Sequence, residues 1–92
     1  MIGNGSNILI SDEGFRGVCM SIEKGFSYVE RHDDVIIAGA GVRLSKFVDF
    51  CITNGFAGAE MLAGIPGTLG GGLIMNAGAY GGEISEYLLD VT

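Results

Sequence analysis

Three glycine-rich stretches are the part of this 92-residue chain whose residue types and spacing could do chemistry. The first, residues 3–7, reads Gly-Asn-Gly-Ser-Asn, and its two glycines allow positive φ and close approach of the backbone to a ligand. Successive N–H groups of such a loop can turn toward one anion, while Asn4, Ser6 and Asn7 add uncharged donors. The residues therefore predict an anion-binding loop, and the Asn4-Gly5 pair equally predicts a plain hairpin turn.

The second stretch, residues 39–41, reads Gly-Ala-Gly and stands between a strand candidate and a helix candidate that begins at Leu44. A strand–turn–helix junction can bind an anion because the first N–H groups of a helix lack partners. A single Gly-x-Gly is a weak indication of a ligand, and a tight connection that passes close to a neighbour explains it more simply. Gly41 remains a candidate binding residue.

The third stretch, residues 64–82, holds eight of the seventeen glycines and is apolar and almost uncharged. Pro66 and Thr68 predict the start of a short helix that reaches Met75, and residues 70–72 leave its first turns without side chains. Each glycine weakens a helix by up to ~1 kcal/mol relative to alanine. Three of them favour contact with a flat or extended ligand over a purely structural helix.

Composition and charge exclude several classes of protein. Five basic and eleven acidic residues give a net charge of −6, which disfavours nucleic acid as a partner. No apolar run approaches the ~20 residues of a membrane span, so we expect no membrane anchor. Cys19, Cys51 and the only histidine, His32, have no metal-ligand spacing, which predicts no metal site. Two cysteines without an export signal predict reduced, buried thiols in a cytoplasmic protein.

Short strands and one helix must position the glycine stretches. Leu44, Phe47, Val48, Cys51 and Ile52 recur at the spacing of one helical face, which predicts a helix over residues 44–54 that buries them together. The Asn54-Gly55 pair predicts its left-handed C-terminal cap. The other expected elements are a meander of antiparallel strands at residues 7–10, 18–22, 28–31 and 35–38 with a turn at 32–34, a helical turn at 59–63, and a final strand at 87–92.

Together these stretches resemble the FAD-binding region of the UDP-N-acetylenolpyruvoylglucosamine reductase (UDP-N-acetylmuramate dehydrogenase) family. Residues 3–7 are similar to the family's first pyrophosphate loop, and residues 12–17 to its Asp-x-Gly-Phe-x-Gly turn. The most specific match covers residues 58–68 and 75–81, ending in Asn-Ala-Gly-Ala-Tyr-Gly. The resemblance implies an α+β fold, part of an FAD-binding domain of the vanillyl-alcohol oxidase or PCMH type, with a small antiparallel sheet and flanking helices.

The resemblance also implies FAD as the cofactor, with NADPH as the hydride donor of the full-length family. It implies a pyrophosphate held by backbone donors and a flavin ring near residues 76–80. The implied cofactor-binding residues are Gly3, Asn4, Gly5, Ser6, Asn7, Gly41, Gly64, Ile65, Pro66, Gly67, Thr68, Gly70, Gly71, Asn76, Ala77, Gly78, Ala79 and Tyr80.

In that family, reduced flavin passes hydride to the enolpyruvyl double bond of a UDP-sugar during peptidoglycan (cell-wall) synthesis. The family's catalytic serine, arginine and glutamate have no matching context in this sequence, so no catalytic residue is carried over. We expect residues 1–92 to be an FAD-binding fragment that lacks the first strand and the substrate domain and is itself inactive.

Two other functions remain open from the residues. One is the FAD-binding fragment of a related flavin oxidase, which a covalent flavin attachment at His32 would favour. The other is a glycine-packed structural module that binds nothing. Three separate glycine loops, each at the end of a strand or a helix, stand against the second of these.

Overall fold

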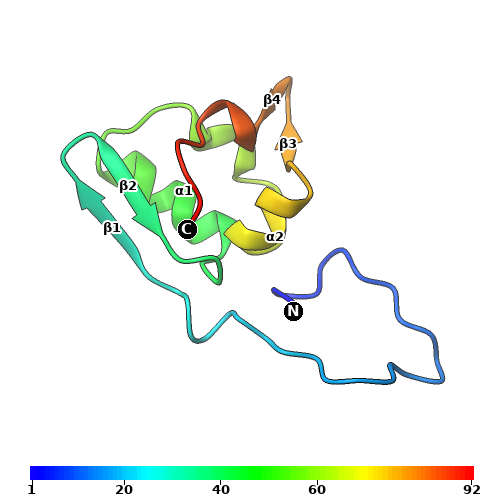
Figure 1. Ribbon diagram of the computed structural model, residues 1–92. Helices are drawn as coiled ribbons and strands as arrows, with labels where there is room; N and C mark the ends of the chain where they lie inside the picture. The colour runs from blue at the N-terminus through cyan, green and yellow to red at the C-terminus, as the bar shows by residue number, and fades with distance from the viewer.

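The computed structural model describes residues 1–92 and confirms an α+β fold with small antiparallel sheets (Figure 1). Residues 1–28, here called the arm, form an extended loop that leaves the folded body, residues 29–92, and returns so that the N-terminus lies beside α2. The elements in chain order are β1 (Val29–His32), β2 (Val35–Ala38), α1 (Leu44–Thr53), η1 (Ala59–Leu62), α2 (Leu69–Ile74), β3 (Gly78–Ala79), β4 (Gly82–Glu83) and η2 (Ile84–Glu86).

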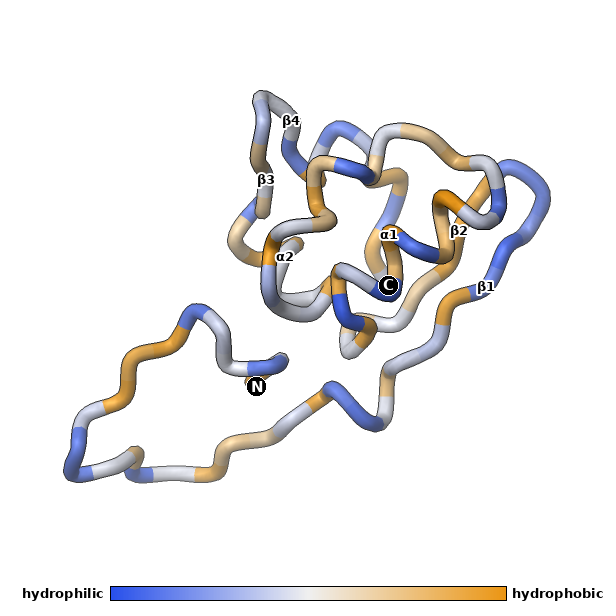
Figure 2. Tube along the Cα trace, turned by 180° about the vertical axis from the view of Figure 1, so that it is seen from behind, coloured by the Kyte–Doolittle hydropathy of each residue, from blue (hydrophilic) through white to orange (hydrophobic).

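The arm contains no strand, so the strands expected at residues 7–10 and 18–22 are wrong. Its one regular contact is a parallel bridge between Ile2 and Ser21. No other strand lies beside the apolar runs to pair with their backbone groups, and a strand needs such a partner. Leu9 is 99% exposed and Val18 is 89% exposed, and Figure 2 shows such hydrophobic stretches lying along the arm, away from the body.

A single hairpin replaces the expected meander. β1 and β2 pair in antiparallel register from Val29 opposite Ala38 to His32 opposite Val35, which confirms the strands near residues 28–31 and 35–38. The turn at residues 33–34 places Asp33 at a φ of 52°. β2 is only half buried, because alternate side chains of a strand face opposite sides and Ile37 is 46% exposed.

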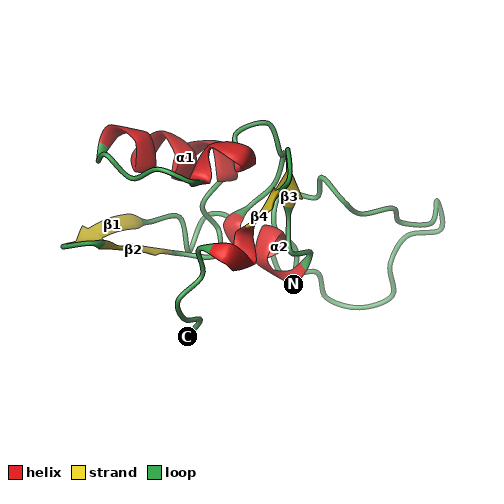
Figure 3. Ribbon diagram, turned by 90° about the horizontal axis from the view of Figure 1, so that it is seen from above, coloured by secondary structure: helices red, strands yellow, loops and turns green.

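The predicted helix is present as α1, which lies along one face of the hairpin (Figures 1 and 3). Leu44, Val48 and Cys51 are buried as expected, and Phe47 packs against the core while partly exposed. Ile52 is 57% exposed, so its predicted burial is wrong. Eight residues after Leu44, it lies about 80° around the helix from it, at the edge of the apolar stripe.

The expected cap at the end of α1 is confirmed. Gly55 adopts a φ of 77°, the N–H of Phe56 donates to the Cys51 carbonyl at 2.9 Å, and the N–H of Gly55 donates to the Ile52 carbonyl at 3.1 Å. These two bonds form a Schellman motif, in which a left-handed glycine lets the last carbonyls of a helix find donors. The Asn54-Gly55 pair therefore fixes where α1 ends.

The core lies between α1, η1 and α2. Its buried cluster consists of Leu44, Val48, Leu62, Leu69 and Ile84. The helical turn expected at residues 59–63 is confirmed as η1, and the glycine-rich helix as α2. The strand expected at residues 87–92 is wrong, because this end of the chain has no strand beside it and Leu89 is 81% exposed. None of the helices has the length and apolar character needed to cross a lipid bilayer.

Candidate functional site

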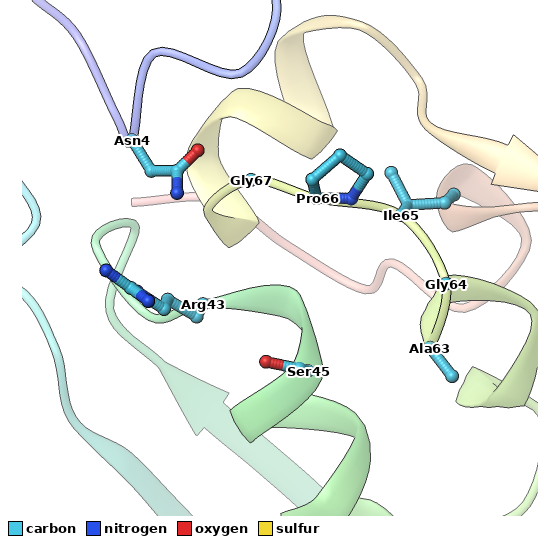
Figure 4. Close-up of a pocket in the computed structure, with 8 residues that line it drawn as sticks. All are labelled: Asn4, Arg43, Ser45, Ala63, Gly64, Ile65, Pro66 and Gly67. Atoms are coloured by element: carbon cyan, nitrogen blue, oxygen red, sulfur yellow. The ribbon is translucent and has the colours of Figure 1, made fainter.

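The first and third glycine stretches meet at an open hollow of about 260 Å³, here called the Arg43 hollow (Figure 4). Figure 4 shows Asn4 and Arg43 at one end of it, Ala63 and Gly64 at the other, and Ser45 between them. Its lining is completed by Ile65, Pro66 and Gly67.

The arm reaches this hollow through two close contacts with the third stretch. The Ser6 hydroxyl donates to the Pro66 carbonyl at 3.1 Å. Gly3 packs so tightly on Thr68 that a Cβ on Gly3 would collide with the threonine Oγ1. Residues 3–7 and 64–68, far apart in the sequence, are thus brought together as two sides of one site.

Backbone hydrogen bonds hold the other side of the hollow in place. The N–H of Leu44 donates to the Gly67 carbonyl at 3.0 Å, and the N–H of Leu69 donates to the Val42 carbonyl at 2.7 Å. Thr68 is 1% exposed, and its hydroxyl accepts the N–H of Gly71 at 3.4 Å, which caps α2. Pro66 therefore lies two residues before the cap and outside the first turn of α2.

The hollow is rich in hydrogen-bond donors without partners. α1 begins at its edge, no side chain caps that end, and no acidic residue stands in the first turn. The backbone N–H groups of the lining residues Asn4, Ser45, Gly64 and Gly67 have no acceptor in the protein, and neither have those of the other residues of the first stretch. Unpaired donors at the positive end of a helix dipole suit an anion such as a phosphate group.

Sequence reasoning missed three lining residues, Ala63, Arg43 and Ser45, of which the last two carry polar side chains. Arg43 precedes α1 and supplies the only lysine or arginine side chain of the hollow, where backbone donors alone were expected. Its Nε donates to Oε1 of Glu23 in the arm at 2.7 Å. The available signal was their position in the sequence, because Arg43 and Ser45 lie two and four residues after the second glycine stretch, around the start of the predicted helix.

Gly41 and Gly70 are used for internal packing. A Cβ on Gly41 would collide with the Ile22 carbonyl, and the Gly41 N–H donates to the Phe26 carbonyl at 2.9 Å. The second stretch therefore matches the close backbone approach that was the simpler of its two interpretations. Gly70 faces Ala40, whose Cβ would lie 2.8 Å from an added Cβ, so the bare backbone expected there for a ligand is covered. Gly71 meets only Thr68 at 3.4 Å and stays more open.

Residues 76–80 lie at a second, separate hollow of about 430 Å³ beside the β3–β4 hairpin. Asn76 and Tyr80 adopt φ values of 46° and 55°, and Tyr80 is 96% exposed at the hairpin turn. Ala77 is held by its N–H, which donates to the Gly72 carbonyl at 2.8 Å. This hollow shares no lining residue with the Arg43 hollow, and α2, about 9 Å long, runs between the two. Its lining residues are Asn76, Gly78, Ala79, Gly81, Gly82, Glu83 and Glu86.

Hydrogen bonds fix the acidic wall of this second hollow. Hydrogen bonding with Asn76 and then with the Ser85 hydroxyl lowers the pKa of Glu83 below its ordinary value, because both partners favour the charged form. Asn76 also accepts the N–H of Ser85 at 3.3 Å through its side-chain oxygen. The Glu86 carboxylate accepts the Glu83 N–H at 3.0 Å, which closes a capping box on η2. The wall is therefore negative at neutral pH.

The other reactive side chains lie away from both hollows. His32 ends β1, is 59% exposed, and its Nε2 stands 3.2 Å from Glu30 Oε2. Both cysteines are free thiols, and Cys19 is exposed, so only Cys51 is buried as predicted. Burial raises the pKa of the Cys51 thiol and keeps it neutral.

Comparisons with known proteins confirm the resemblance of the glycine stretches to this reductase family. The family model described as "FAD binding domain" matches residues 1–92. A UDP-N-acetylenolpyruvoylglucosamine reductase of Halalkalibacterium halodurans is 47% identical over 88 residues, which cover 96% of this chain and 29% of that protein. Enzymes of the same name from Pelagibacter ubique and Listeria monocytogenes are 48% and 46% identical, covering 99% and 96% of this chain. The chain spans 29–30% of the length of these three relatives.

Proposed function

Because the chain belongs to the FAD binding domain family, we propose that it is the FAD-holding part of a flavin-dependent reductase. The observation that carries this proposal is the meeting of residues 3–7 with residues 64–67 around a hollow of unpaired donors. A dinucleotide cofactor presents a pyrophosphate, which is the kind of anion that such donors fit.

The pyrophosphate of FAD would lie in the Arg43 hollow, held by the N–H groups of Ser45, Gly64 and Gly67 and by those of the first glycine loop. These dipoles act locally, which suits a chain whose net charge of −6 repels anions at a distance. Gly64 has open space where a Cβ would stand, so the backbone can approach the phosphates closely.

The flavin ring would lie toward residues 76–80, on the far side of α2 from the pyrophosphate. Asn76, Ala77, Gly78, Ala79 and Tyr80 would line this end, and Thr68, Gly70 and Gly71 would hold the turn of α2 between the two ends. Tyr80 is exposed and free to stack on an aromatic ring. Two hollows, one for the pyrophosphate and one for the flavin ring, fit an extended cofactor that reaches both.

In the whole protein, we propose that the chain serves the reduction of UDP-N-acetylenolpyruvoylglucosamine, the compound in the names of its relatives. NADPH as the hydride donor and peptidoglycan synthesis as the pathway are part of this proposal and rest on the family resemblance of the glycine stretches. Bound FAD would supply hydride transfer, while residues 1–92 bind and orient it and supply no catalytic acid or base. The free thiols fit a reducing, cytoplasmic setting.

The test fills the hollow without disturbing the fold. Gly64→Val places a side chain in open space at the hollow wall, and Gly25→Val does the same away from it, where nothing lies within 4 Å either. We expect Gly64→Val to weaken FAD binding about tenfold or more, the effect of losing one charge-assisted hydrogen bond. Flavin fluorescence titrations to tens of micromolar measure this. Equal FAD affinity in both variants, or no FAD binding by the parent chain, would refute the proposal.

A further inference from the structure

Arg43 stands out because it brings a full positive charge to a hollow otherwise built from neutral donors. The chain has five lysines and arginines, and no other one lines this hollow. Arg43 occupies the N-cap position of α1, with a ψ of 139°. Its side chain therefore starts at the positive end of the helix dipole. Figure 4 shows it below Asn4, at the arm's edge of the hollow.

Glu23 holds this side chain by one nitrogen only. Nε donates to Glu23 Oε1 at 2.7 Å, whereas both Nη groups have no acceptor in the protein. A guanidinium carries five N–H donors in a rigid fork that matches two phosphate oxygens. Arg43 can therefore keep its bond to Glu23 and still offer the Nη donors to an anion.

The pair is exposed enough to leave Arg43 available. The Arg43 side chain is 62% exposed and that of Glu23 is 28% exposed, and ion pairs of this kind contribute little stability. A bound pyrophosphate would be repelled by the Glu23 carboxylate and attracted by the arginine. The arm thus carries a residue that orients the cation and limits the affinity at the same time.

We propose that Arg43 is the charged contact of the ligand's pyrophosphate, and that Glu23 orients its guanidinium while its own charge weakens the binding. This inference rests on the proposed FAD site for the identity of the ligand. It adds a specificity-determining side chain to a site otherwise made of backbone donors. Its chemistry, a guanidinium beside two glycine loops, also applies to free pyrophosphate.

The experiment measures the affinity of the 92-residue chain for FAD and for inorganic pyrophosphate in parallel. Arg43→Ala should weaken both about tenfold, and Arg43→Lys should give an affinity between those of the parent and the alanine variant. Lys46→Ala removes the same charge from the same helix, where its Nζ only reaches the Ser27 carbonyl at 3.4 Å, and should change neither affinity.

A separate variant and a matched control test whether the charge of Glu23 weakens binding. Glu23→Gln keeps an oxygen that can accept from Arg43 Nε but removes the charge, and it should tighten both ligands about two- to fivefold. Glu13→Gln removes an equal charge from the arm at a side chain with no partner, and should have no effect. A Glu23→Gln variant no tighter than the parent would overturn the role of Glu23.

The outcomes separate this inference from the proposed function. FAD binding that is equal in the parent and Arg43→Ala, or Arg43→Lys as weak as Arg43→Ala, overturns the inference and leaves the FAD site intact. Pyrophosphate binding that depends on Arg43, in a parent that does not bind FAD, supports the inference and refutes the function. A parent that binds neither ligand overturns both. Thermal melts that coincide for Arg43→Ala and Lys46→Ala exclude a folding defect as the cause.

Discussion

At the scale of single residues, the second hollow shows how two neutral side chains set the charge of a third. Glu83 is a fully exposed carboxylate, yet its pKa lies below its ordinary value of 4.5 because it is hydrogen-bonded with Asn76 and Ser85. A lowered pKa in the folded state stabilises the fold above the ordinary value, and this contribution is lost as pH falls through the folded pKa. Acidification below about pH 4.5 should therefore loosen the β3–β4 hairpin before it affects the core.

Replacing Asn76 tests this directly. Asn76→Gly removes the larger cause while glycine accepts the φ of 46°, so the pKa of Glu83 should rise toward 4.5. The carboxyl chemical shift of Glu83, followed by NMR from pH 2 to 7, measures it. Tyr80→Gly relieves the positive φ of the other non-glycine residue in this region without touching Glu83 and should leave the pKa of Glu83 unchanged. An unaltered pKa in Asn76→Gly would show that the carboxylate is held by other groups.

At the scale of elements, α1 buries one residue and exposes another although both fit the same sequence pattern. Cys51 and Ile52 both fit the apolar spacing, yet Cys51 is 2% exposed and Ile52 is 57% exposed. Cys51→Asp should lower the free energy of unfolding by several kcal/mol, because a buried charge without a partner replaces a neutral thiol. Ile52→Asp should lower it by less than ~1 kcal/mol, because its carboxylate stays in water. Urea melts of both variants compare them, and similar losses would contradict the burial of this face.

The sequence predicts an element well when the element depends on interactions between residues close together in the chain. The hairpin turn before Val35, the helix spacing and the Asn54-Gly55 cap act between near neighbours, and the structure confirms them. The strands expected near Leu9 and Leu89 depended on partners elsewhere in the chain, and a run of apolar residues does not show whether a partner exists. Local signals therefore predicted these elements and their ends, whereas the pairing of distant strands and the exposure of Ile52 depend on what packs against them.

The candidate site also has one part that local sequence signals predict and one part that depends on long-range contacts. Its glycine loops could be identified from the sequence because glycine and proline restrict the backbone locally. Arg43 and Ser45 join the site because the start of α1 is hydrogen-bonded to the turn before α2 through the Leu44 and Leu69 N–H groups, while the Ser6 and Gly3 contacts bring the arm to the same turn. No local pattern encodes that meeting. A second long-range contact, within the body, places Gly70 against Ala40, whose carbonyl accepts the Gly70 N–H at 2.8 Å, although Gly70 was expected to face a ligand.

At the scale of the whole molecule, the proposed function makes the site residues binding groups, with no catalytic acid or base among them. The Arg43 hollow offers backbone donors, an amide, a hydroxyl and a guanidinium. The 92-residue chain supplied with FAD, NADPH and UDP-N-acetylenolpyruvoylglucosamine should therefore give no turnover above that of free flavin. NADPH absorbance at 340 nm, followed with and without the chain, measures this. Chain-dependent NADPH oxidation coupled to product would show that a catalytic group lies within residues 1–92.

The return of the arm has a consequence for how tightly the chain can hold any ligand. Ser6 and Pro66 are 60 positions apart in the sequence, so docking the arm costs loop-closure entropy. The local elements of the body form without this cost. Molecules in which the arm is undocked lack one wall of the site. Because only the docked fraction is competent to bind, the measured dissociation constant is the intrinsic one divided by that fraction. Any affinity measured for this chain is therefore a lower limit on the affinity of the fully assembled hollow.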